Sequence, residues 1–268
     1  MTAAAAVSKG RVTVTNFSLS YDTLEGPVEA VSDAAICVNP GEFVSIIGPS
    51  GCGKSTLLNA VAGFLKPTRG EVAVDGEPVA GPSADRGMVF QQYSLFPWKT
   101  VRENVEFGLK MKGIDRSKRE TSARTLLGLA GLLSFENQYP DSLSGGMKQR
   151  VGIIRALATG PKVLLLDEPF GALDALTRAK LQDELLKIVA DTKSTVLMVT
   201  HDVDEAVLLA DRIVMMTNGP AATIGEVLAI DLPRPRDRVA LAEDTRYHHY
   251  RTAVLEFLYR RQAHVEAA

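Results

Sequence analysis

The stretch "GPSGCGKST", residues 48–56, constrains this chain more than any other feature of its sequence. The apolar run "EFVSII" comes before it and "STLLNAVAGFL" comes after it. The second segment has apolar residues at helical spacing, namely Leu57, Leu58, Val61 and Leu65. The sequence therefore predicts a buried strand, a glycine-rich loop and a helix over 55–65, in that order.

The composition of this loop is suited to holding phosphate. Its glycines let the backbone curl so that successive N–H groups point inward, and the following helix adds its positive N-terminal end. Lys54 supplies a charge for the β- and γ-phosphates, while Ser55 offers a hydroxyl to Mg²⁺. We expect a nucleoside triphosphate to be bound by the nine loop residues Gly48, Pro49, Ser50, Gly51, Cys52, Gly53, Lys54, Ser55 and Thr56.

Two later segments repeat the design of a buried strand with polar residues at its end. "KVLLLDEP" ends in Asp167 and Glu168, and "STVLMVTHD" ends beside His201. Continuous apolar runs that alternate with helices predict a parallel sheet, in which ligands bind at the carboxyl ends of the strands. An acid in this position can hold Mg²⁺ through water, and its neighbour can polarise an attacking water. A surface turn or a helix cap is the alternative interpretation of the acid pair.

The remaining segments differ in periodicity. Residues 11–42 mostly alternate in hydrophobicity, which predicts strands, with a change of phase and a possible bulge near Asn16. Residues from about 93 to 150 carry helical patterns only. "TVRE" (100–103) and "SKRE" (117–120) both match the capping box and are predicted to open two helices. We therefore expect an N-terminal antiparallel β subdomain and a helical subdomain at about 93–150, inserted in an α/β domain over 11–240.

The segment "LSGGMKQR", residues 143–150, predicts a second anion nest at a helix start, formed by Ser144, Gly145 and Gly146. An ordinary capped helix is the alternative. One nucleotide seldom needs two nests from the same chain, so we expect this nest to hold the γ-phosphate of a nucleotide bound by a facing subunit. In a two-fold dimer this exchange is reciprocal, and two ATP molecules would join two chains.

The bulk properties exclude several classes of protein. The formal net charge is −2 and there is no long basic stretch, so nucleic acid is not expected as the main partner. No apolar run approaches the roughly 20 residues of a membrane-spanning helix, and two cysteines form no disulfide framework. We expect a cytoplasmic protein with a mobile leader over 1–10. The Pro- and Arg-rich "DLPRPRDR" (231–238) leads to a tail over 241–268 that fits an amphipathic helix.

Four motifs in this order, "GPSGCGKST", "LSGGMKQR", "VLLLDEP" and "VTHD", resemble the ATP-binding subunit of an ABC transporter from about residue 11 to 230. The resemblance implies a P-loop ATPase that needs ATP and Mg²⁺, with Ser55, Gln91 and Asp167 as Mg²⁺ ligands. It also implies catalytic roles for Glu168, Gln91 of the Q-loop and the switch residue His201. Asp174 matches the D-loop that lies across the dimer interface, and Tyr21 matches the aromatic residue that stacks on adenine.

Some of these residues have a plainer interpretation. Tyr21 fits a core position at a strand end as well as a stacking position. Phe96 and Trp98 in "SLFPW" fit either the core or an exposed aromatic patch that receives a helix of a membrane subunit.

The segment "DRGMVFQQYSLFPWKTVRENVEFGL" and the tail "YRTAVLEFLYRRQ" resemble the importer ATPases for nitrate, sulfonates, taurine and bicarbonate, and the nitrate, nitrite and bicarbonate branch in particular. This implies a peripheral protein on the cytoplasmic face of the membrane that energises uptake of a small anion. Its partners would be a second ATPase subunit, identical or different, two permease subunits and, indirectly, a solute-binding protein. The alternatives are sulfonate, taurine or bicarbonate import and, in another class, a soluble ATPase switch acting on nucleic acid or ribosomes.

Overall fold

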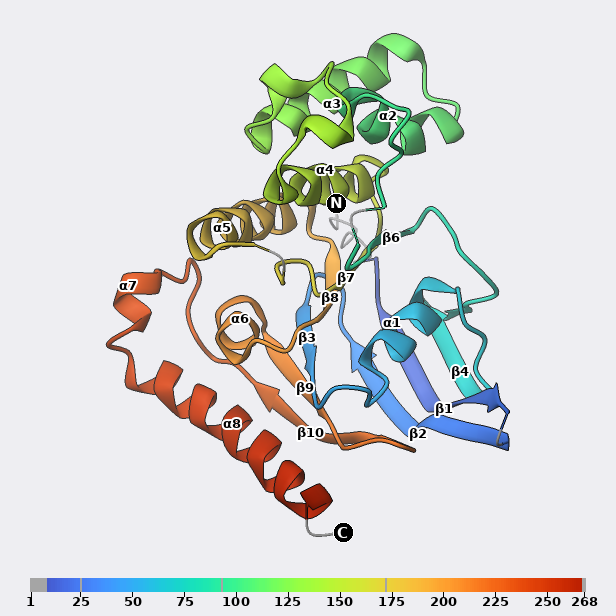
Figure 1. Ribbon diagram of the computed structural model, residues 1–268, viewed down its shortest axis with the longest axis vertical. Helices are drawn as coiled ribbons and strands as arrows, with labels where there is room; N and C mark the ends of the chain where they lie inside the picture. Colours follow the sequence, from blue (N-terminus) through green and yellow to red (C-terminus); the bar gives the residue numbers. More distant parts are fainter. Residues whose placement is uncertain (1–8, 25, 93, 172, 267–268) are drawn as a thin grey trace, which may run out of the picture. The chain divides into compact units, whose positions relative to one another are not determined.

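The computed structural model describes residues 9–24, 26–92, 94–171 and 173–266, so most of the expected leader lies outside the described residues. The chain divides into two compact units, one formed by Met1–Pro82 with Thr195–Ala268 and the other by Ser83–Ser194. Figure 1 labels their helices and strands.

The first unit contains the expected antiparallel sheet, with strand order β2-β1-β4-β5. These strands are β1 (Val12–Thr23), β2 (Gly26–Val38), β4 (Arg69–Val74) and β5 (Glu77–Pro78). The pairing of β1 with β2 shifts between Val14 and Phe17, where Asn16 has φ 49°. The change of phase in the sequence is therefore an irregularity in the strand, as predicted, and it lets Val14 and Phe17 both point into the core.

The same unit carries parallel strands. β3 (Phe43–Ile47) pairs in parallel with β8 (Thr195–Val199) and β9 (Arg212–Met216), and β10 (Ile224–Ala229) is antiparallel to β9. Every residue of β3 and β8 is buried, which explains why their sequences are mostly apolar. The helices of this unit are α1 (Lys54–Ala62), α6 (Val203–Leu209), α7 (Arg238–Leu241) and α8 (Thr245–Glu266).

Helix α1 is shorter than the sequence pattern predicts. It ends at Ala62 because Gly63 takes a left-handed conformation (φ 86°) and its N–H bonds to the carbonyl oxygen of Ala60 at 3.1 Å. A Cβ at Gly63 would lie 2.3 Å from the carbonyl oxygen of Gly81, so glycine is required here. The prediction that Leu65 belongs to the helix was wrong.

The second unit is mainly helical. Its strands β6 (Arg86–Val89) and β7 (Val163–Asp167) pair in parallel. Its helices are α2 (Val101–Met111), α3 (Arg116–Leu129), α4 (Gly145–Ala158) and α5 (Ala175–Thr192), with short 3₁₀ turns η1 (Leu133–Phe135) and η2 (Pro140–Ser142). Apolar residues from α2, α3 and α4 form its core, among them Val101, Val105, Ala123, Leu127, Val151 and Ile154.

One of the two predicted capping boxes is present. Thr100 accepts a hydrogen bond from the N–H of Glu103, whose carboxylate accepts one from the N–H of Thr100, and α2 begins there. The prediction for "SKRE" was wrong, because α3 begins at Arg116, before the predicted cap residue Ser117. Its cap is Asp115, whose side chain accepts from the N–H groups of Ser117 and Lys118.

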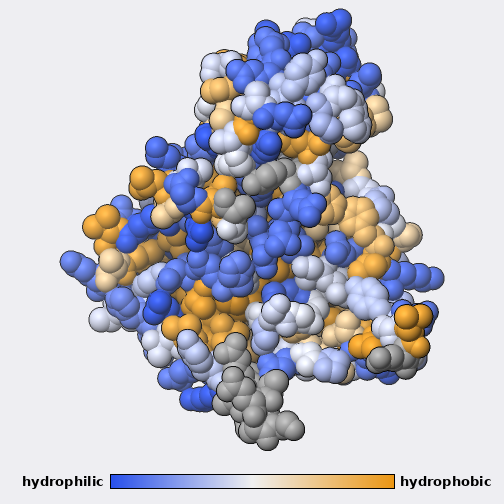
Figure 2. Space-filling model, in the orientation of Figure 1, coloured by the Kyte–Doolittle hydropathy of each residue, from blue (hydrophilic) through white to orange (hydrophobic). Residues whose placement is uncertain are grey.

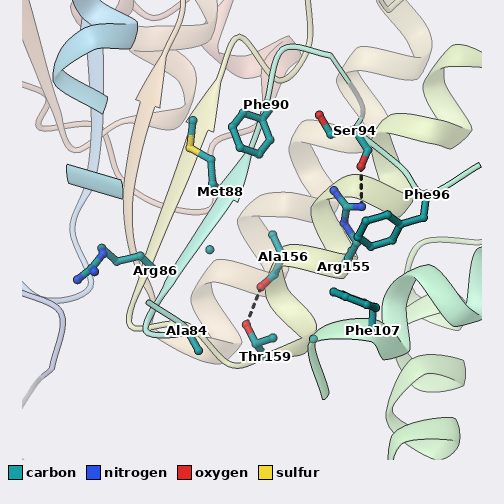
Figure 3. A pocket seen from close by; sticks show the side chains of 12 residues that line it. Ala84, Arg86, Met88, Phe90, Ser94, Phe96, Phe107, Arg155, Ala156 and Thr159 are labelled. Atoms are coloured by element: carbon teal, nitrogen blue, oxygen red, sulfur yellow. Dashed lines mark hydrogen bonds between the residues drawn. The ribbon is translucent and has the colours of Figure 1, made fainter. Parts of the chain in front are cut away.

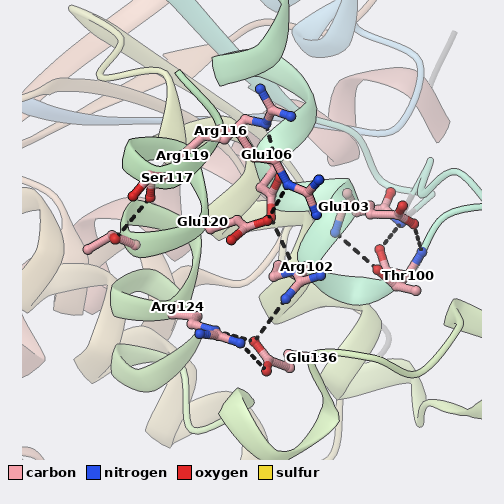
Figure 4. Close-up of polar contacts among 12 residues, drawn as sticks. Thr100, Arg102, Glu103, Glu106, Arg116, Ser117, Arg119, Glu120, Arg124 and Glu136 are labelled. Carbon is pink, nitrogen blue, oxygen red and sulfur yellow. Dashed lines mark hydrogen bonds and ion pairs between the residues drawn. The ribbon is translucent and has the colours of Figure 1, made fainter. Parts of the chain in front are cut away.

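Ion pairs join α2, α3 and the segment after η1 (Figure 4). Glu106 pairs with Arg102 at 3.2 Å and with Arg119 at 3.1 Å, and Glu136 pairs with Arg124 at 2.9 Å. Hydrophilic side chains accordingly cover much of the α2–α3 region at the top of Figure 2. Within the described ranges, none of the helices combines the length and the apolar character that a bilayer-spanning segment needs.

Candidate functional site

The glycine-rich loop lies between β3 and α1, in the first unit. Gly51 and Gly53 both have positive φ, at 75° and 89°. At Gly53, an added Cβ would lie 2.4 Å from Cγ2 of Val31, whereas an added Cβ at Gly51 would meet no atom within 4 Å. Among the described residues, no side chain caps the N-terminus of α1, and Ser55 in its first turn is exposed. The loop therefore offers an anion the positive end of a helix.

Lys54 is folded into this loop. Its ammonium donates to the carbonyl oxygens of Gly48 at 2.8 Å and Pro49 at 2.7 Å, and the side chain is buried. Cys52 is also buried, and its burial raises the pKa of the thiol, so this cysteine stays protonated at neutral pH. The Lys54 side chain thus folds back onto its own loop. The glycines, the lysine and the helix terminus together fit a phosphate chain.

Tyr21 lies at the end of β1 and is 42% exposed, so the interpretation as a buried core residue was wrong. Its hydroxyl is 3.1 Å from Oγ1 of Thr56, in the first turn of α1. The aromatic ring is therefore tied to the phosphate loop. Its exposure fits the predicted contact with a flat base, which remains a prediction.

His201 follows β8 and is exposed, in the same unit as the loop. The residues on either side of it are hydrogen-bonded. The Asp202 N–H donates to Oγ1 of Thr200 at 3.0 Å, and the Asp202 carboxylate caps α6 by accepting from the Glu205 N–H at 3.1 Å. The sequence analysis identified neither this cap nor the role of the buried Thr200 hydroxyl.

The second unit brings two of the predicted catalytic residues together. The Gln91 amide donates to the Glu168 carboxylate at 3.0 Å, across 77 residues of sequence. Glu168 has φ 45°, a conformation that is uncommon outside glycine and is concentrated at functional sites. Asp167, next to it, is the last residue of β7. The two acids therefore lie at the end of this strand, and Gln91 is bonded to one of them.

The "LSGGMKQR" and "GALD" motifs both begin helices in this unit. Ser144 caps α4 by accepting from the Met147 N–H, and Asp174 caps α5 by accepting from the Thr177 N–H, which lowers the pKa of that carboxyl. Gly145 and Gly146 form the first turn of α4. A Cβ at Gly146 would lie 2.8 Å from Cγ2 of Thr177, so this glycine also permits close packing.

A pocket of about 410 Å³ opens between β6, α2 and α4 (Figure 3). Phe96 and Phe107 line it with ring centroids 4.6 Å apart. The Arg155 guanidinium lies 5.3 Å from the Phe96 ring and donates to the carbonyl oxygen of Ser94 at 2.8 Å. Trp98 is 5.7 Å from Phe96 and 70% exposed. Trp98 is thus an exposed residue, which confirms that part of the predicted aromatic patch, and the interpretation of Trp98 as a core residue was wrong. Sequence reasoning missed Arg155, whose helical position carried no signal.

The chain is similar to known proteins along most of its length. Residues 31–171 match the model of the family described as "ABC transporter". The chain is 53% identical to the nitrate import ATP-binding protein NrtD of Synechococcus elongatus, over 97% of this chain and 96% of that protein. It is 50% identical to the bicarbonate transport ATP-binding protein CmpD of Synechocystis, over 96% and 92%.

A solved structure shows the same fold. It is an ATP-binding cassette described as a dimer in a post-hydrolysis state bound to ADP and Pi. It is 36% identical, covers 83% of this chain and 100% of its own, and superposes with a TM-score of 0.74. The family model spans more than half of the chain, and the relatives match it almost end to end. The chain therefore belongs to the ABC transporter family and is an ATPase with the ATP-binding-cassette fold.

Proposed function

We propose that this protein is the ATP-hydrolysing subunit of an importer for a small anion, with nitrate or nitrite as the substrate. The observation that carries the ATPase assignment is the hydrogen bond between Gln91 and Glu168 at the end of a buried strand, with Glu168 in a strained backbone conformation. The assignment of the substrate rests on the similarity to the nitrate import protein, which is 53% identical over nearly the whole chain.

In this proposal the phosphate loop, residues 48–56, binds ATP, with Lys54 on the β- and γ-phosphates and Tyr21 against the adenine. Mg²⁺ would be held by Ser55 and Gln91, and by Asp167 through water. Glu168 orients and polarises the attacking water, and His201 contacts the γ-phosphate. Bound ATP supplies a phosphoanhydride bond whose cleavage releases ADP and phosphate.

A second ATPase subunit completes each site. Ser144, Gly145 and Gly146 would hold the γ-phosphate of a nucleotide bound by that partner, with Asp174 across the interface. The relative solved as a dimer supports this arrangement. Closure of the dimer would move two permease subunits, and hydrolysis would reset them. The second subunit would be a copy of this chain or a different ATPase subunit.

The permease would dock at the pocket beside Phe96 and Trp98, at the cytoplasmic face of the membrane. An exposed aromatic side chain next to a hollow of about 410 Å³ suits the apolar side of an inserted helix. A solute-binding protein would deliver the anion to the permease. The soluble switch acting on nucleic acid or ribosomes is not favoured, since the similar proteins are named for transport.

The variant Glu168→Gln tests the ATPase assignment. We expect ATP binding to remain and turnover to fall at least about 100-fold, the size of a general-base contribution, with a closed dimer accumulating on ATP. ATP hydrolysis, nucleotide binding and size-exclusion chromatography measure these quantities. Glu71→Gln, at an exposed position of β4, is the matched control and should behave as the wild type. Turnover close to wild type in Glu168→Gln would refute the role of Glu168.

Uptake by the complete transporter tests the substrate. Cells that depend on this chain should take up labelled nitrate, and the Glu168→Gln variant should not support that uptake. Uptake of labelled bicarbonate in place of nitrate would move the protein to the bicarbonate group, to which it is 50% identical.

A further inference from the structure

The short helix α6 begins two residues after His201 and has seven residues. A helix of this length is not stable by itself, so its position depends on what holds its ends. At its start, Thr200 accepts from the Asp202 N–H and donates to the Glu205 carboxylate at 2.7 Å, in buried surroundings. The backbone on both sides of His201 is therefore attached to the first turn of α6.

Helix α8 holds that first turn from outside. The Tyr247 hydroxyl donates to Oδ1 of Asp204 at 2.9 Å, and Nε of Arg251 donates to the same oxygen at 2.8 Å. Burial and the neighbouring Asp204 carboxylate raise the pKa of Tyr247, so its hydroxyl remains a donor at neutral pH. Helix α8 is anchored in turn by Val254, which is fully buried, and by Phe257, which packs over Gly225 of β10.

The "PRPR" segment, residues 233–236, holds the C-terminal end of α6. The Arg236 guanidinium donates to the carbonyl oxygens of Val207, Leu208 and Ala210 at 3.1, 2.9 and 2.8 Å. Arg234 donates to the carbonyl oxygen of Leu209 at 2.7 Å and pairs with Asp211. The last carbonyl groups of a helix have no partner within the helix, and these arginines supply one for each.

Burying the charged side chain of Arg236 costs free energy of desolvation. The residue is 8% exposed, and its burial lowers the pKa of the guanidinium to about 10. A buried cation is retained where several acceptors compensate it, and here the acceptors are the carbonyls of α6. Cations at a helix C-terminus also complement its dipole, as Arg234 and Arg236 do.

We propose that the four side chains Arg234, Arg236, Tyr247 and Arg251, together called the C-terminal clamp, are positioning residues that fix α6 and through it His201. The inference rests on the proposed function, in which His201 contacts the γ-phosphate. The clamp does not touch the nucleotide. It holds both ends of the helix whose first turn carries the backbone of His201, and it links hydrolysis to the C-terminal helix.

The test weakens the clamp at the end near His201, in the purified full-length chain. Tyr247→Phe removes one bond to Asp204 and keeps the ring, and Tyr247→Phe with Arg251→Gln removes both. We expect kcat per nucleotide-binding site to fall about tenfold in the double variant, since small displacements of a reacting group have effects of this order. The KM for ATP should stay as in the wild type, because the phosphate loop is untouched. Titration of nucleotide-binding sites corrects for any unfolded fraction.

Two further measurements separate positioning from stability. The chain has 4 histidines, and labelling their rings with ¹³C allows His201 to be observed by NMR and assigned with His201→Gln. Its resonance should shift in the clamp variants. It should not shift in Arg246→Gln, which breaks the Asp244–Arg246 ion pair of the same segment without touching α6. Arg251→Lys, which keeps the charge beside Asp204, should recover most of the kcat that Arg251→Gln loses.

The outcomes are distinguishable. If the double variant lowers only the unfolding temperature, with kcat per site and the His201 resonance unchanged, the clamp is merely structural and the proposal is overturned. If the double variant does not fold, Tyr247→Phe alone decides by the same two readouts. If His201→Gln hydrolyses ATP like the wild type, the role of His201 in the proposed function fails, whatever the clamp variants show.

Discussion

The phosphate loop and helix α6 both contribute to the candidate site, but they are held in different ways. The hydrogen bonds of Lys54 reach carbonyl oxygens only five and six residues away in sequence. The bonds that hold α6 come from residues 25 to 47 positions away, on the "PRPR" segment and α8. The loop is therefore a local structure, whereas α6 depends on the return of the C-terminal chain.

This difference predicts where substitutions act. A local structure is disturbed mainly by changes within the motif itself, either in its backbone conformation or in the space that its own residues fill. A short helix held from outside is disturbed by changes far from it in sequence. The following substitutions test this contrast, starting with the largest expected effect.

Gly53→Ala should cause the largest loss. Alanine at φ 89° is strained by roughly 1–2 kcal/mol, and its Cβ would also collide with the side chain of Val31 at 2.4 Å. Together these should weaken ATP binding by at least about 100-fold, measured by titration with a fluorescent nucleotide. Gly51→Ala is the matched control, because it has a similar φ but open space around the added Cβ, and it should lose only about tenfold.

Equal losses in the two glycine variants would show that strain alone matters and that the approach of Val31 to the loop does not. A wild-type affinity in Gly53→Ala would show that the loop adapts to a side chain there. It would then not be the rigid local structure described above.

Arg236→Met should be next. It leaves the carbonyl oxygens of Val207, Leu208 and Ala210 without their donor, and a buried polar group without a partner costs about 1–3 kcal/mol. Removal of the desolvated cation offsets part of this cost. We expect the free energy of unfolding to fall by about 2 kcal/mol in urea titrations, with ATP affinity unchanged.

Arg234→Met is the control for Arg236→Met. It removes one hydrogen bond to the Leu209 carbonyl oxygen and an ion pair with Asp211 in which both side chains are 39% exposed, so it should cost about 1 kcal/mol, less than Arg236→Met. If Arg234→Met is the more damaging variant, burial is not what makes the clamp strong.

The smallest effect should come from the ion pair of Arg124 on α3 with Glu136, which also joins separated residues but lies at the surface, where the Arg124 side chain is 53% exposed. The Arg124 guanidinium lowers the pKa of the Glu136 carboxyl below its ordinary 4.5. A carboxyl whose pKa is lowered on folding stabilises the protein above its unfolded pKa, and this contribution disappears as the pH falls through the folded pKa. Arg124→Gln should therefore lower the unfolding temperature slightly at about pH 7 and not at about pH 3.

Thermal unfolding of the wild type and of Arg124→Gln at the two pH values measures this difference. A difference in unfolding temperature that persists at the lower pH would show that Arg124 stabilises α3 by packing rather than by its charge.

Much of the site was predictable because each motif encodes its own geometry over a few residues. The glycines, Lys54 and Ser55 specify a phosphate loop, and "TVRE" specifies a helix start that the structure contains. The two helix boundaries that were predicted wrongly, the start of α3 and the end of α1, also depend on residues close by in sequence. "SKRE" fits a capping box, but Asp115, two residues before it, accepts from the Ser117 N–H that the box would use, and Gly63 ends α1 before Leu65.

The sequence by itself determined the phosphate loop, the buried strands, the Thr100 cap of α2 and the family to which the chain belongs, because these depend on periodicity and on contacts within a few residues. Only the tertiary structure decided that Gln91 meets Glu168 and that Arg236 and Tyr247 hold the helix after His201. Such bonds join residues far apart in the chain. Their partners are chosen by how the strands and helices pack, which no short stretch of sequence encodes.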